Sequence, residues 1–207
     1  MRDIDDFLPL VMPCAPNAPE PTVIRHLRDA AARFCERTRL WRCTDTIVTD
    51  GKDAEAISAP QDGIVFEVRA CSLDGRPLDP ISLDKLALDR PNWRKEDVGS
   101  GGGKWFASPR PGTVQAIPRS SGTLFVEVAL KPTMTALTLP SFMLDLYGQD
   151  IADGAAAGVL MTPEADFAKP DYGAVLKAQF EATLARLADQ GSRGQQRAPR
   201  RQRAKFF

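Results

Sequence analysis

The side chains with catalytic or metal-binding potential in this 207-residue chain are few and lie far apart. Cys14, Cys35, Cys43 and Cys71 include no C-x-x-C pair, whereas a tetrahedral zinc site requires four ligands at short local spacings. His26 and Cys35 are nine residues apart in a predicted helix, which places them on opposite sides at about 100° per residue. We therefore expect free thiols, no metal, no cofactor and no enzymatic activity.

A glycine-rich stretch, VGSGGGKW at residues 98–105, is superficially similar to a phosphate-binding loop. That loop requires G-x-x-x-x-G-K-[ST], because its backbone amides bind phosphates and its final hydroxyl binds magnesium. Here Val98 stands at the first glycine position and Trp105 replaces the hydroxyl residue. We interpret this stretch as the flexible tip of a loop between strands.

Charge divides the chain into an acidic body and a basic tail. The 27 lysines and arginines equal the 27 aspartates and glutamates in number. Residues 191–207 hold six cations and no acid, which leaves 21 cations against 27 acids elsewhere. This pattern is typical of a folded body with an interaction arm. The residues predicted to form the arm are Arg193, Arg197, Arg200, Arg201, Arg203, Lys205, Phe206 and Phe207.

We expect the arm to gain a fixed structure only when it binds a partner. Ordering each residue costs roughly 1–2 kcal/mol. Six charge-assisted hydrogen bonds of about 1.5–3 kcal/mol each, with two buried phenylalanines, nearly cancel that cost over the arm. Many copies on a symmetric partner would bind firmly through effective concentration. An unstructured solubilising tail is the alternative, but two terminal aromatic residues do not favour it.

The elements that carry these residues follow from periodicity. Apolar residues recur at steps of three and four over residues 21–41, 140–163 and 171–190, which predicts three helices. Leu146 and Val175 are expected in the buried stripes of the second and third helices. A glycine at position 191 is expected to end the third helix.

The middle of the chain has a different character, because short runs rich in Val, Ile, Thr and Phe alternate with Gly, Pro and Asp. The runs read TDTIVT, GIVFEVRACSL, GTVQAI and GTLFVEVALKP, and LDGRPL carries the Asp-Gly signal of a tight hairpin. These runs predict a small antiparallel sheet.

We therefore predict an α+β fold: a helical bundle of about three helices with an inserted small antiparallel β-sheet domain and an extended C-terminal arm. The predicted boundaries are 1–21 for an extended proline-rich segment, 22–43 and 133–190 for the helical core, 44–132 for the inserted β domain, and 191–207 for the arm.

Two short features are candidates for packing between subunits. Gly154 and Gly158 lie four residues apart in a strip of small residues, and each costs its helix about 1 kcal/mol relative to alanine. Close approach of another helix, from the same chain or from a neighbouring subunit, would offset that cost. Phe7 and Leu8, in the proline-rich segment, are expected on the domain surface or against a neighbour.

Two stretches resemble head–tail adaptor proteins of tailed bacteriophages, also called connector or head-completion proteins. DDFLPLVMPCAPNAPEPTVIRHLRDAAARFCERTRLWR is similar to the opening of that family, and LPSFMLDLYGQDIADGAAAGVLMTP is similar to its second block, including the Gly-Ala run. The ending in arginines and aromatic residues fits the same family.

The resemblance implies a structural virion protein of the phage neck. In that family a ring of adaptors, usually twelve, binds beneath the portal protein, and the C-terminal arms insert along the portal subunits. Tail or nozzle proteins attach below, and the ring extends the channel through which double-stranded DNA passes. The resemblance also implies contacts between neighbouring adaptor subunits.

A different class of function remains open from the residues alone. A nucleic-acid-binding protein would place the arginine tail on phosphates, and six such contacts would give a log–log salt slope of roughly −5. The N-terminus has three aspartates before a short apolar run broken by Pro9 and Pro13. We therefore expect no signal peptide, no membrane span, and synthesis in a cytoplasm, that of the host bacterium if the resemblance holds.

Overall fold

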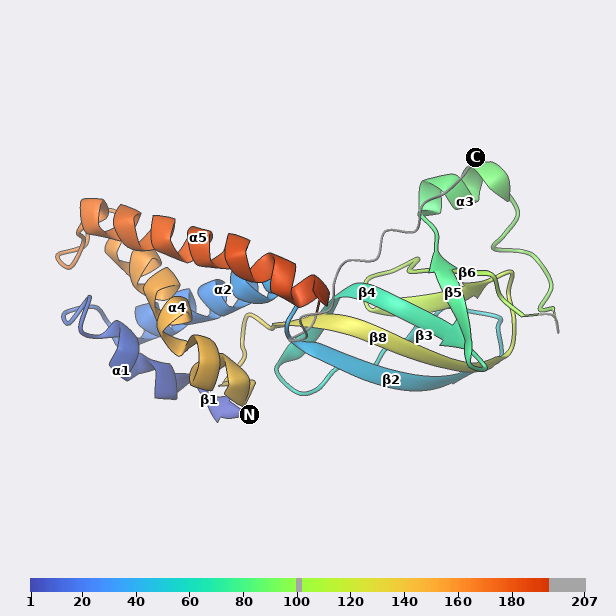
Figure 1. Ribbon diagram of the computed structural model, residues 1–207, viewed down its shortest axis with the longest axis horizontal. Coiled ribbons are helices and arrows are strands. Elements are labelled where there is room, and N and C mark those ends of the chain that lie inside the picture. The colour runs from blue at the N-terminus through green and yellow to red at the C-terminus, as the bar shows by residue number, and fades with distance from the viewer. Residues whose placement is uncertain (100–101, 194–207) are drawn as a thin grey trace. The chain divides into compact units, whose positions relative to one another are not determined.

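The computed structural model describes residues 1–99 and 102–193 of the chain (Figure 1). The chain divides into two compact units. The helical unit contains Met1–Leu40 and the chain from Ala136 onward, and the sheet unit contains Trp41–Thr135.

Three long helices form the body of the helical unit: α2 (Glu20–Thr38), α4 (Ser141–Leu160) and α5 (Pro170–Arg193). Each of the three contacts the other two, and α1 packs on α4, as Figure 1 shows. The shorter elements are β1 (Arg2–Asp3), the 3-10 helix η1 (Ile4–Phe7), α1 (Leu8–Val11) and β9 (Thr138–Leu139), with β1 and β9 paired antiparallel.

Helix α2 forms where the apolar spacing predicts it. Its buried side chains recur every three or four residues from Val23 to Thr38, and Pro21 lies in the first turn, where no backbone N–H donor is required. The helix ends at Arg39, which adopts the left-handed conformation with φ of 54°. Glu20 is the first residue of α2, and no side chain caps its N-terminus.

The sheet unit contains seven strands of one sheet and a short helix within the described residues. In chain order these are β2 (Arg42–Thr49), β3 (Glu55–Ala56), β4 (Gly63–Leu73), β5 (Arg76–Pro80), α3 (Leu83–Asp89), β6 (Trp105–Ala107), β7 (Thr113–Ile117) and β8 (Gly122–Pro132). The strand order is β2-β8-β4-β5-β6-β7-β3.

Strand β8 lies between β2 and β4, and residues along part of it alternate as a half-buried strand requires. Leu124, Val126 and Val128 are fully buried on one face, whereas Phe125 is exposed on the other. Strands β2 and β4 both pair with β8 in antiparallel orientation. The apolar faces of β4 and β8 form much of the core of the sheet unit.

The hairpin between β4 and β5 confirms the turn that the Asp-Gly pair predicts. Leu73 pairs with Arg76, so Asp74 and Gly75 form a two-residue turn. Their φ angles of 48° and 76° are both positive, as a type I′ turn requires. The Asp74 carboxylate also accepts a hydrogen bond from the Thr123 N–H, at 2.8 Å.

The predicted fold is wrong in the size and kind of its sheet and in the number of its helices, although the class is still α+β. The sheet is mixed because β5 pairs with β6 in parallel, and parallel neighbours require a long crossover, here residues 81–104 with α3. Helix α3 begins at the Ser82 cap, whose hydroxyl accepts from the Lys85 N–H at 3.3 Å.

The prediction of an extended segment over residues 1–21 is also wrong in part. Residues of this segment form η1 and α1. Proline is tolerated in the first turn of a helix, and Pro9 occupies that place in α1.

Candidate functional site

The predicted arm lies almost wholly beyond the described part of the chain. Arg193 is the last residue of α5. That helix continues through Gly191, so the expectation that this glycine ends it is wrong. The remaining residues predicted for the arm lie outside the described residues: Arg197, Arg200, Arg201, Arg203, Lys205, Phe206 and Phe207.

Gly154 and Gly158 permit close packing between helices of the same subunit. A Cβ added to Gly154 would lie 2.8 Å from Cδ1 and Cε1 of Phe180 on α5. A Cβ added to Gly158 would overlap Nδ1 of His26 on α2. Both glycines thus face helices of their own unit, and both stay half-buried. Their part in packing between subunits stays a prediction.

The same two glycines line a groove of about 640 Å³ on the helical unit, between α2, α4 and α5. Ala157, Met161 and Phe180 supply further apolar lining. Its lining cations are Arg33, Arg37 and Lys177, and its lining acids are Asp29, Glu36 and Glu181. We call this concavity the groove.

The charges around the groove are only partly paired. Nη2 of Arg33 lies 2.7 Å from Oε1 of Glu181, which links α2 to α5 across the groove. Because both side chains are partly exposed, this pair contributes on the order of 0.2–1 kcal/mol. Arg37 and Lys177 form no ion pair with any residue that the structure describes. The lining holds as many acids as cations, and Asp29 is likewise without an ion pair among the described residues.

His26 lies in the groove beside Gly158. Burial lowers the pKa of His26 below its ordinary value of 6.5, Asp29 opposes this shift, and Arg25 adds to it. The imidazole is therefore neutral near pH 7, and its tight position against α4 favours a packing role.

A second surface feature is a ridge on α4, formed by the exposed Asp145, Leu146 and Gln149 and the half-buried Asp153, which we call the α4 ridge. Gln149 Nε2 donates a hydrogen bond of 2.8 Å to Asp153 Oδ1. Leu146 is 58% exposed, so its predicted place in the buried stripe is wrong. Helix α4 contains no lysine or arginine.

The prediction that Val175 of α5 is buried is also wrong, because this side chain is 52% exposed. Of the two N-terminal candidates for subunit packing, Phe7 is fully buried within its own unit, because η1 and α1 turn its ring inward. The expectation that it lies on the surface is therefore wrong. Leu8 is half-buried at the start of α1, and its contact with a neighbour stays a prediction.

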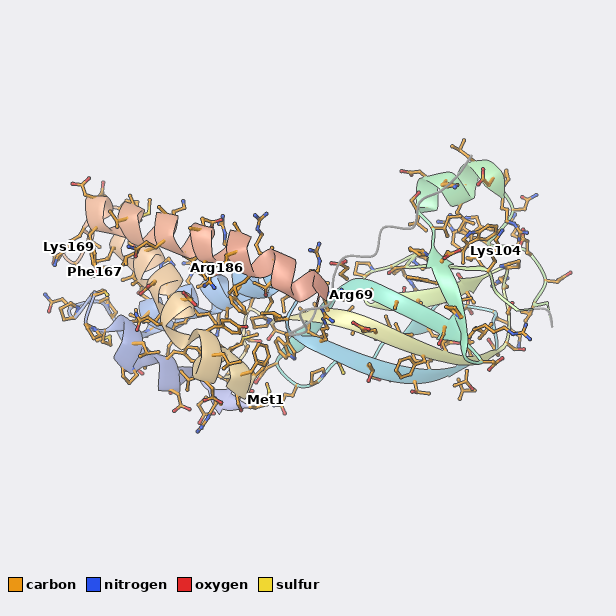
Figure 2. All side chains as sticks on the ribbon, in the orientation of Figure 1. Met1, Arg69, Lys104, Phe167, Lys169 and Arg186 are labelled. Carbon is orange, nitrogen blue, oxygen red and sulfur yellow. The ribbon has the colours of Figure 1, made fainter. Side chains whose placement is uncertain are left out.

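The glycine-rich stretch leads into a strand, which a phosphate-binding loop does not do. Residues 100–101 lie outside the described residues, and Lys104 is followed by β6 rather than by a helix. Lys104, labelled in Figure 2, has its Nζ 4.6 Å from the centroid of the Trp105 ring. Arg90 lies over the same ring at 5.8 Å and pairs with Glu96 at 3.1 Å. These contacts stabilise the sheet unit locally.

The described residues include no cluster of three or more His, Cys, Asp or Glu side chains placed to hold a metal ion. The four cysteines are free thiols, and burial raises the pKa of the Cys71 thiol to about 11. In the described ranges, we find no helix with the length and apolar character needed to cross a membrane.

The model of the family described as SU10 adaptor protein matches residues 2–203. No curated protein matches the chain.

Proposed function

The chain belongs to the SU10 adaptor protein family, and on this premise we propose that it forms a ring joining the portal vertex of a tailed-phage capsid to the tail. Membership confirms the resemblance to phage head–tail adaptors. The family is one of phage structural adaptors rather than enzymes, and the chain is a virion component. The match over residues 2–203 is the observation that carries the proposal, because it includes both units and most of the arm.

In the proposed arrangement the basic arm binds the portal protein, and twelve copies form the ring. Residues 191–207 carry six cations and no acid, so an acidic surface on the portal would attract them. One arm would bind weakly, because the conformational entropy lost on ordering it nearly cancels the favourable free energy of its contacts. Twelve arms on a symmetric partner raise the effective concentration of every further contact.

The ring would extend the channel for double-stranded DNA, with a tail or nozzle protein attached below. The chain outside the arm has six more acids than cations (27 against 21). An acidic lining repels the phosphate backbone, so DNA could pass through the neck without binding to it. We propose that the protein is made in the cytoplasm of the host bacterium and is incorporated at the neck.

The test compares three proteins for binding to purified tail-less capsids that carry the portal: the full chain, a chain ending at Arg193, and a full-length chain with the arginines after residue 193 changed to glutamine. The truncation keeps the whole of α5. We expect both variants to keep the helical circular dichroism of the full chain and to lose sedimentation with capsids. Normal joining by the truncated chain would refute the role of the arm.

The same proteins separate this function from nucleic-acid binding. Each is titrated with duplex DNA at several salt concentrations. An adaptor is expected to bind duplex DNA weakly and without specificity, whereas six phosphate contacts would give a log–log slope of roughly −5. A slope of that size in the full chain, lost on truncation, together with no binding to capsids, would favour the nucleic-acid function.

A further inference from the structure

We propose that the chain carries a built-in hinge, at Leu40 and at Met134–Thr135, about which the sheet unit turns while the fold of each unit stays unchanged. The chain passes between the two units twice, once after Leu40 and once after Thr135. None of the three hinge residues belongs to a helix or a strand. The hydrogen bonds on both sides of each passage fix the position of the hinge.

On the sheet-unit side, each passage ends at a residue that the sheet unit holds firmly. The Trp41 carbonyl accepts a hydrogen bond of 2.8 Å from the Leu130 N–H, and Trp41 is only 6% exposed. Its ring lies against Gly63, where an added Cβ would be 3.0 Å from two of the ring atoms. On the second passage, the Thr133 N–H donates to the Asp62 carbonyl at 2.9 Å. Trp41 and Thr133 therefore move with the sheet unit.

On the helical-unit side, the first passage begins at the end of α2. The Arg39 N–H donates to the Cys35 carbonyl at 2.8 Å and closes the last turn of that helix. The second passage ends at Ala136, which is fully buried. The Ala136 carbonyl accepts a hydrogen bond of 2.8 Å from Nε of Arg28 on α2. Arg39 and Ala136 therefore move with the helical unit.

The N-terminal residues hold the second passage further along the chain. The Ile4 N–H donates to the Leu137 carbonyl at 2.9 Å, and β1 pairs with β9. Arg28, Ile4 and β1 thus form a clasp that fixes residues 136–139 on the helical unit. Loss of the whole clasp would lengthen the free part of this passage from residues 134–135 to residues 134–139. The clasp therefore sets the length of the hinge.

The residues between these contacts are few, which restricts the motion to a hinge. Leu40 is half-buried, and Met134 is 76% exposed. Each residue has two soft backbone dihedral angles, so only a small number of angles can change. The two passages leave the sheet unit from paired strands, β2 and β8. Two short attachment points define one axis, and a few loop residues absorb the φ and ψ changes of such a rotation without any change in packing inside either unit.

The hinge has a use in the neck, and this use rests on the proposed function. The arm follows α5 of the helical unit in the sequence. Binding of the arm to the portal would therefore fix the helical unit and leave the sheet unit able to turn toward a tail-side partner. A chain without the hinge would present the sheet unit at a single angle.

Residual dipolar couplings of the weakly aligned, ¹⁵N-labelled full chain test the hinge. We expect the two units to require alignment tensors of unequal size, with backbone order parameters of about 0.85 inside each unit. Met134→Gly with Thr135→Gly should increase this inequality, because glycine enlarges the accessible range of φ and ψ. Lys52→Gly with Asp53→Gly is the matched control, since both residues are exposed in a loop of the sheet unit, and it should leave the inequality unchanged.

Arg28→Ala tests the clasp, and Arg25→Ala, at an exposed position of the same helix, is its control. Loss of the hydrogen bond to Ala136 should increase the inequality, whereas the control should not change it. Equal results for these two variants would overturn the clasp.

One alignment tensor that fits both units of the unaltered chain would overturn the hinge. Glycine variants at residues 134 and 135 that behave like their control would overturn its position. These couplings are measured on the free chain, whereas the proposed function is decided by binding to capsids. A rigid chain that joins capsids would therefore refute the hinge alone, and a hinged chain that does not join them would refute the proposed function alone.

Discussion

Replacing Gly154 by alanine tests how closely α4 and α5 pack. In a helix interior, glycine to alanine normally stabilises by about 1 kcal/mol. At this position the new Cβ would lie 2.8 Å from two ring atoms of Phe180, which is only 4% exposed. Overpacking of this kind costs about 1–3 kcal/mol, so Gly154→Ala should leave the protein between unchanged and about 2 kcal/mol less stable.

Gly148 of the same helix is the matched control. A Cβ there would lie 3.2 Å from Cδ1 of Leu10 and 3.3 Å from Cδ1 of Leu144. These atoms are the ends of flexible side chains and can move at little cost. Gly148→Ala should therefore stabilise by up to about 1 kcal/mol, and the two variants should differ by about 1–3 kcal/mol.

The assay is urea unfolding followed by two signals. Circular dichroism at 222 nm reports chiefly on the helices, whereas Trp41, Trp93 and Trp105 all lie in the sheet unit and report on it through fluorescence. Two signals are needed because two units need not unfold in one step. The loss in Gly154→Ala should appear in the helical transition.

A second substitution distinguishes the steric cause from any other. Phe180→Leu makes room for the new methyl group, so the double variant Gly154→Ala with Phe180→Leu should lose less than the sum of the two single losses. The reasoning is refuted if Gly154→Ala is as stable as Gly148→Ala, or if the two substitutions are simply additive.

Two further outcomes are expected. Because burial lowers the pKa of His26, the free energy of unfolding should decrease as the pH falls below about 6.5. The contribution of His26 to this pH dependence is at most about 1.4 kcal/mol per pH unit. His26→Gln should therefore weaken the pH dependence measured by urea unfolding between pH 5 and 7.5. An unchanged slope would contradict that assignment. Leu86 of α3 is fully buried with Trp93 and Ile117, so Leu86→Ala should cost about 2–5 kcal/mol in the tryptophan-monitored transition, and a loss under 1 kcal/mol would show that α3 is dispensable.

Periodicity and turn chemistry predict the longer elements well. Helix α2 and strands β4 and β8 lie where their apolar patterns indicate, and the turn at Asp74 forms as the Asp-Gly pair predicts. These elements are long enough, or their turn residues specific enough, for local preference to agree with the final packing.

The short elements could not be predicted in the same way. Helix α3 spans only Leu83–Asp89, too few residues for a periodic pattern to stand out. The parallel pairing of β5 with β6 joins residues far apart in sequence, and no local signal encodes it. Leu146 fits a helical stripe by spacing alone, yet the surface beside it is left uncovered by the other helices of the unit.

The candidate contact surfaces differ in how far the sequence reveals them. That residues 141–160 lack any lysine or arginine is visible in the sequence and indicates an acidic helix face. The groove is not visible, because spacing cannot tell whether Gly154 and Gly158 face a helix of the same unit or a neighbouring subunit. In the structure they face α5 and α2, and the Phe180 ring and the His26 imidazole fill the space where their side chains would lie. For an assembly protein, the informative residues are those that a single copy leaves exposed or unpaired, and among the described residues these include Leu146 on the ridge and Asp29, Arg37 and Lys177 at the groove.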